Sequence, residues 1–184
     1  MPLNRRPASL AAAAAALVLG LAACGGSSGV SAGAYVKSFC QAVGPFESDV
    51  VKRTNTLAVT RSKSVAEGKK AFQSFLSGIA ADSRRAASQL RAAGTPNVKN
   101  GKAFAQTIVG AFDQLNRTMD QAVKQAASLP TSTPQAFTAA ARQVDDTVRS
   151  SMTQIGTKLQ SGGLRSPALE QAAAKEPACR AFGS

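Results

Sequence analysis

The sequence contains no histidine and no tryptophan, and Tyr35 is its single tyrosine. The absence of histidine excludes catalytic triads that use an imidazole, histidine general bases and zinc sites with histidine ligands. Neither a P-loop nor a Gly-x-Gly-x-x-Gly fingerprint opens a helix after a strand, and no strand is evident. We therefore expect no metal and no cofactor. The single tyrosine, Tyr35, is expected to pack at one end of the fold.

Acidic residues are scarce, with 10 Asp and Glu against 22 Lys and Arg. Asp145 and Asp146 are adjacent, so on a helix they point about 100° apart and do not converge as a glycosidase pair does. Aspartates instead have a base four residues away, a spacing typical of exposed helix surfaces. The pairs are Asp113–Arg117, Asp120–Lys124, Arg142–Asp146 and Asp145–Arg149. The sequence carries no recognisable catalytic constellation, and we expect no enzymatic activity.

Long hydrophobic runs are also absent after residue 24, where no segment reaches the roughly 20 apolar residues that a membrane-spanning helix needs. The apolar run from Leu10 to Leu19 has about half that length. It follows Arg5 and Arg6 and leads into small residues, which is the pattern of a secretory signal peptide.

The residues that end this run, Leu21-Ala22-Ala23-Cys24, resemble the lipobox of a bacterial lipoprotein. The resemblance covers only the first two dozen residues. In that family the leader, here residues 1–23, is removed, and Cys24 becomes the new N-terminus with diacylglycerol on its thiol. The resemblance implies a protein held by its lipid on the outer face of a bacterial cytoplasmic membrane. The alternative is an ordinary cleaved signal peptide in which Cys24 is incidental.

The mature chain divides into a short tether and a helical body. Residues 24–33 are rich in glycine and serine and predict a flexible tether, whereas residues 34–184 are long enough for one domain with a core. Without Arg5 and Arg6, the 22 basic residues fall to 20, which against 10 acidic residues gives a net charge of +10. Abundant alanine and few β-branched runs favour helix.

Apolar residues recur at every third or fourth position over four long segments, which predicts four amphipathic helices. Their expected ranges are about 34–59, 63–93, 95–129 and 133–161, with a short helix over about 166–175. Their buried stripes include Phe46, Val50, Phe72, Ile79, Phe112, Met119, Val148 and Met152. Glycines inside these segments, at positions 68, 78, 101, 110 and 156, are expected to let helices approach closely.

Proline residues mark several helix boundaries. A hydroxyl residue before proline predicts three helix starts, at Thr95-Pro96, Thr133-Pro134 and Ser166-Pro167. Pro45 interrupts the first segment and predicts a kink, or two helices that meet there.

Short turns make neighbouring helices antiparallel, so we predict an all-α fold, an antiparallel up-down four-helix bundle plus a short C-terminal helix. This topology brings Cys40 and Cys179 to the same pole. Export to an oxidising compartment predicts that they form a disulfide, which closes a loop of about 140 residues and stabilises the fold by roughly 5 kcal/mol at most. The alternative is two free buried thiols. Two cysteines this far apart cannot make a four-thiolate metal site.

Positive charge is concentrated in residues 61–94, which hold seven Lys and Arg and two acids. Spacing by multiples of seven places four of the bases on one face, and we refer to them as the basic stripe: Lys63, Lys70, Arg84 and Arg91. Such a stripe fits an anionic cell-wall polymer, anionic lipid headgroups or an acidic envelope protein. Nucleic acid is not expected, because no aromatic residues are interleaved with the bases. The alternative is a solvated face that keeps an alanine-rich bundle soluble.

The chain resembles the small helical envelope lipoproteins of high-GC Gram-positive bacteria, most of which have no assigned activity. We expect a non-enzymatic binding or interaction module of the cell envelope, whose contact surface is the basic stripe or a groove between helices. The alternative is a carrier that opens the bundle to hold a lipid or another small apolar ligand.

Overall fold

The computed structural model describes residues 29–59, 64–161 and 165–182. The leader, Cys24 and Lys63 lie outside the described residues. Four long helices follow one another: α1 (Ala32–Val59), α2 (Val65–Ala92), α3 (Gly101–Ala127) and α4 (Pro134–Ser161). A short helix, α5 (Pro167–Lys175), and a 3-10 helix, η1 (Pro177–Phe182), complete the described chain. The predicted all-α fold with a short C-terminal helix is confirmed.

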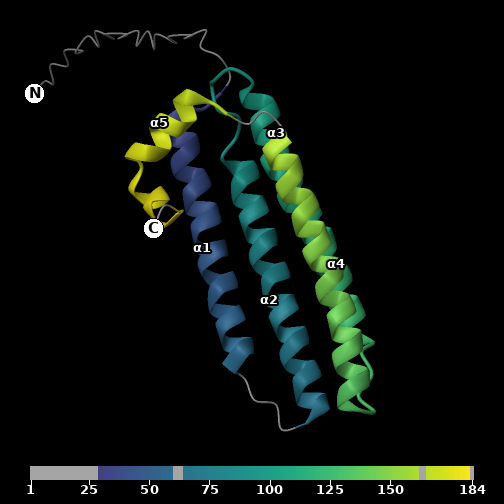
Figure 1. Cartoon of the computed structure of the whole chain (residues 1–184). Coiled ribbons are helices and arrows are strands. Elements are labelled where there is room, and N and C mark those ends of the chain that lie inside the picture. The colour runs from purple at the N-terminus through teal and green to yellow at the C-terminus, as the bar shows by residue number, and fades with distance from the viewer. Residues whose placement is uncertain (1–28, 60–63, 162–164, 183–184) are drawn as a thin grey trace, which may run out of the picture.

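Successive long helices run in opposite directions, and neighbours in the chain pack against one another (Figure 1). After α4 the chain turns back, and α5 and η1 pack on α1 (Figure 1). α4 packs on α3 and touches α2, but among the described residues it makes no close backbone contact with α1. The bundle is therefore open along one side, between its first and last long helices.

The main core lies where α2, α3 and α4 meet. Its buried side chains include Leu76 and Ile79 of α2, Leu115 and Met119 of α3, and Ile155 of α4. Burial of one such side chain contributes about 1.5–3 kcal/mol. To this cluster α1 adds only partly buried side chains, because its facing side borders the opening. Among the described residues, α1 is thus the one long helix that adds no fully buried side chain to the main core.

Two of the three predicted hydroxyl–proline helix starts are confirmed. α4 begins at Pro134, where the Thr133 hydroxyl accepts a hydrogen bond from the backbone N–H of Ala136 at 3.2 Å. α5 begins at Pro167 directly after Ser166. Proline suits these first helical positions because its missing N–H has no intrahelical partner there.

The third predicted start is wrong, because the segment before α3 pairs with the beginning of the body instead. The backbone N–H of Val30 donates to the carbonyl of Thr95 at 2.8 Å, and the Val30 carbonyl accepts from the N–H of Asn97 at 2.7 Å. Pro96 is buried within this bridge. Asn100 then takes a left-handed conformation (φ 60°), and α3 starts at the next residue. Val30 thus contacts the segment before α3, and α1 begins two residues later, at Ala32.

Pro45 lies inside α1, which continues as one helix rather than two. Proline removes the hydrogen bond to the carbonyl of Gln41, four residues earlier. Both residues are exposed, so water can bond to that carbonyl. The helix therefore continues through the proline on its solvent side.

Candidate binding groove

The open side of the bundle exposes an apolar groove of about 460 Å³. Side chains of α1 and α4 form its two lips, and side chains of α2 and α3 line it between them. Four of the eight phenylalanines of the chain lie here: Phe46, Phe72, Phe75 and Phe112. The rings of Phe46 and Phe112 pack edge to face with their centroids 5.4 Å apart. This packing fixes the position of α1 across the groove from α3.

The lips carry apolar side chains in contact with solvent. Val51 of α1 is 53% exposed and Met152 of α4 is 44% exposed, and these are the exposed large hydrophobic residues of the described chain. Both line the groove. The prediction that Met152 is buried is therefore wrong, because α1 does not close over it. Isolated exposed apolar side chains are common, but a pair that flanks one apolar groove is typical of a binding site.

Two carboxylates are the charged groups that line the groove in the described chain, Glu47 on α1 and Asp145 on α4. Arg149 pairs with Asp145 at 3.0 Å, which confirms the expected spacing of four residues. The hydrogen bond with Asp145 raises the pKa of the Arg149 guanidinium. Glu47 has no ion-pair partner among the described residues. The mouth of the groove is therefore acidic although the protein as a whole is basic.

The described members of the basic stripe are only partly free to meet a polyanion. Arg84 pairs with Asp120 of α3 at 2.7 Å, and Arg91 pairs with Asp113. These contacts correct the expectation that both aspartates pair within α3. Lys70 is exposed, and no partner for it is found among the described residues. The stripe thus serves in part as a line of ion pairs between α2 and α3.

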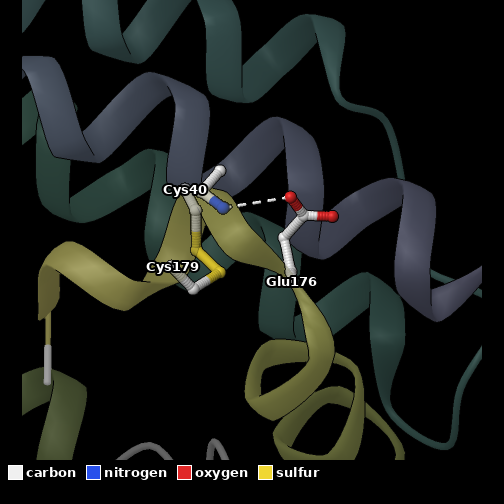
Figure 2. The surroundings of a disulfide bond; sticks show 4 residues. Cys40, Glu176 and Cys179 are labelled. Atoms are coloured by element: carbon white, nitrogen blue, oxygen red, sulfur yellow. Dashed lines mark hydrogen bonds between the residues drawn. A yellow bond between two sulfur atoms is a disulfide. The ribbon is translucent and has the colours of Figure 1, made fainter.

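The disulfide between Cys40 and Cys179 fastens η1 to α1 (Figure 2). The carboxylate of Glu176 lies beside it and accepts a hydrogen bond from the backbone N–H of Ala178 at 3.1 Å (Figure 2). Cys40 is buried together with Leu169 of α5 in a second cluster at this pole. The C-terminal segment is therefore held to the first helix both by a covalent bond and by apolar packing.

Tyr35 packs at the same pole, as expected. Its ring lies edge to face with that of Phe104, with centroids 5.9 Å apart. The side chain is 1% exposed, and its hydroxyl has no hydrogen-bond partner among the described residues. Burial raises the pKa of this phenol. A second hollow, of about 400 Å³, lies between this aromatic pair and α5, and it contains the disulfide in its wall.

Sequence reasoning identified most groove residues but assigned them to a closed core. Periodicity marks Val43, Phe46, Val50, Phe72 and Phe112 as apolar, and it cannot say whether a facing helix covers them. The sequence carries no signal of the opening, because the apolar spacing of α4 resembles that of the other long helices, although in the structure this helix buries only Val144 and Ile155 fully.

No family model, no curated protein and no solved structure matches the chain. Within the described residues, no helix is both long enough and apolar enough to cross a membrane. The same residues contain no group of three or more side chains arranged to hold a metal ion.

Proposed function

We propose that the protein is a lipid-anchored extracytoplasmic lipoprotein that binds a small apolar molecule in the groove between α1 and α4. The observation that carries the proposal is the open side of the bundle, with its apolar groove of about 460 Å³. Ligand pockets measure about 300–1,000 Å³, are mostly apolar, and carry a few polar groups that orient the ligand. The groove meets all three conditions.

The anchoring part of the proposal depends on the lipobox, Leu21-Ala22-Ala23-Cys24. Residues 1–28 are outside the described chain, so this part is supported by the sequence pattern. The bridge from Val30 to Thr95 fixes the chain six residues after Cys24 at the pole that also holds α5. Six extended residues span about 20 Å, so a lipid on Cys24 holds that pole close to the membrane surface.

The geometry favours an apolar ligand over a polyanion on the basic stripe. Arg84 and Arg91 already face aspartates of α3, and an incoming polyanion must compete with these carboxylates. An apolar ligand in the groove need not displace an ion pair, because the described lining is apolar except for Glu47 and Asp145. We therefore place the binding surface in the groove and regard the stripe chiefly as a contact between helices.

Binding of Nile red, an uncharged apolar dye, tests the proposal. The chain from residue 25 onward keeps every described residue, and a circular dichroism melt with the disulfide intact checks that it folds. Saturable dye fluorescence with one site per chain is the expected result. A Met152→Gln variant is expected to weaken binding about tenfold. It replaces an apolar side chain on the lip with a polar amide, and the lost apolar contact with the dye is worth roughly 1–2 kcal/mol.

The matched control is Thr153→Gln, at an exposed neighbouring position that does not line the groove. This variant is expected to bind the dye as the parent does. Absence of saturable binding, or equal weakening by both variants, would contradict a ligand site in the groove.

A further inference from the structure

The geometry points to a specific class of ligand for the groove: an amphiphile with one apolar tail and a cationic head group. This inference rests on the proposed function, because it concerns the same groove and names the chemistry of its occupant. It follows from the placement of charge around the groove rather than from the charge of the whole protein.

The lining is apolar except for Glu47 and Asp145, which stand on opposite lips. No lysine or arginine of the described chain lines the groove. A tail that packs on the phenylalanines leaves its head group at the mouth, where it meets carboxylates from α1 and α4. An anionic head group, such as that of a fatty acid, meets like charge there, whereas a cationic one meets opposite charge.

The ion pair between Asp145 and Arg149 does not remove this preference. Both side chains are well exposed, at 57% and 75%, and the pair lies within one helix turn. Exposed pairs of this kind are worth only a few tenths of a kcal/mol, so a cation bound at the lip can share or displace Arg149. The carboxylate of Glu47 is exposed and has no ion-pair partner among the described residues.

The net charge of +10 after removal of the leader favours anions at long range. At physiological ionic strength the screening length is about 8 Å, so charges farther away contribute little to a head group at the lip. The two carboxylates of the mouth therefore decide the preference once the tail is bound.

Three amphiphiles with the same decyl tail test the inference: decyltrimethylammonium, decyl maltoside and decyl sulfate. Each is titrated by calorimetry below its micelle concentration at physiological salt, into the chain from residue 25 onward, with circular dichroism to verify that the fold persists. We expect the cation to bind about fivefold more tightly than the uncharged glycoside, because the Coulomb attraction of one or two nearby carboxylates in water is of this size. The anion is expected to bind more weakly than both.

Variants identify the source of the preference. Glu47→Gln combined with Asp145→Asn is expected to abolish the tighter binding of the cation relative to the glycoside. Asp145→Asn alone is expected to weaken the preference. Asp146→Asn removes the same single charge at the next position of α4, which does not line the groove, and is expected to leave the preference intact.

The possible results separate the two proposals. Saturable binding of all three amphiphiles with equal affinity, or with the sulfate tightest, overturns the cationic-ligand inference and leaves the apolar groove as proposed. A loss of preference in Asp146→Asn equal to that in Asp145→Asn also overturns the inference, because the effect then reflects overall charge. Binding of none of the three contradicts the proposed function itself.

Discussion

Arg53 of α1 reaches over Gly78 of α2, and its Nε donates to a carboxylate oxygen of Asp82 at 2.9 Å. Asp82 is 4% exposed, and Arg85 approaches its other oxygen at 3.4 Å. A carboxylate this deeply buried is tolerated only with charged partners. Gly78 provides the space, because a side chain at this position would occupy the place of the Arg53 guanidinium. This ion pair links α1 to α2, and it adds to the attachment of a helix that places only partly buried side chains in the main core.

Gly78→Ala is expected to lower the free energy of unfolding, although alanine is the better helix former by about 1 kcal/mol. The added methyl displaces the guanidinium from Asp82, and loss of a partner from a buried carboxylate costs about 1–3 kcal/mol. Chemical denaturation followed by circular dichroism measures the change.

Gly110→Ala is the matched control, because Gly110 is exposed in the middle of α3 with nothing within 4 Å of an added methyl. This variant is expected to raise the free energy of unfolding by about 1 kcal/mol. In a protein that already carries Arg53→Ala, adding Gly78→Ala should raise the free energy of unfolding by the same amount as Gly110→Ala does. A double-mutant cycle detects this difference from the parent protein. Equal stabilisation by both glycine variants in the parent protein would show that Gly78 does not serve the ion pair.

Tyr35→Phe is expected to raise the free energy of unfolding by about 1 kcal/mol, because it removes a buried hydroxyl that lacks a partner. The raised pKa of the phenol also has a consequence for pH. The folded state holds this proton more tightly than the unfolded chain, so the stability linked to Tyr35 is complete below about pH 10 and is lost as pH rises through the folded pKa.

The chain suits this measurement, since Tyr35 is its single tyrosine and tryptophan is absent. Ultraviolet absorbance of the phenolate therefore reports Tyr35 alone. In the folded protein the titration should lie above that of the denatured protein. The alkaline loss of stability should be smaller in Tyr35→Phe. A phenol that titrates identically in the folded and denatured protein would exclude the buried environment.

Replacement of both disulfide cysteines, Cys40→Ser with Cys179→Ser, is expected to lower the free energy of unfolding by a few kcal/mol. The disulfide spans a sequence separation of 139 residues, for which chain entropy gives an upper figure of about 5 kcal/mol. Thermal unfolding of the parent with and without reductant should reproduce the difference. A reductant effect that persists in the double variant would assign the change to another cause.

Cys24→Ser is expected to release the protein from the membrane fraction of cells that export it. Lipid attachment requires the cysteine thiol, and the described chain offers no spanning helix as a second anchor. Cell fractionation with mass spectrometry of the N-terminal peptide measures both location and modification. Cys179→Ser serves as the control and should stay with the membrane. An unmodified N-terminal peptide in the parent would favour the ordinary signal peptide instead.

The helical fold could be predicted because its determinants are local. The spacing of apolar residues and the stops at glycine and proline act within a few residues, and the starts at Pro134 and Pro167 follow from them. The disulfide could also be predicted, since the up-down topology brings its cysteines together. Of the three hydroxyl–proline starts, that of α3 failed, because a tertiary contact from Val30 holds Pro96 in an extended segment.

The groove depends on how the helices assemble, which their individual patterns do not specify. An apolar stripe on α1 is equally consistent with a covered and an uncovered face, and Met152 shows that its partner helix leaves it exposed. The same limit applies to charge. Asp113 and Asp120 each had a base within their own helix, yet both pair with arginines of α2. The exposed glycine at 110 likewise serves no close helix approach.

The position of the disulfide near both ends of the body has a consequence for proteolysis. A single cut at any peptide bond between Cys40 and Cys179 leaves two pieces joined through sulfur, because that whole stretch, with α2, α3 and α4, belongs to one covalent ring. A nick between α1 and α2 or between α4 and α5 therefore changes the protein to an interlinked two-chain molecule of unchanged mass, apart from one added water. Fragments of such a nicked protein separate on a denaturing gel only after reduction.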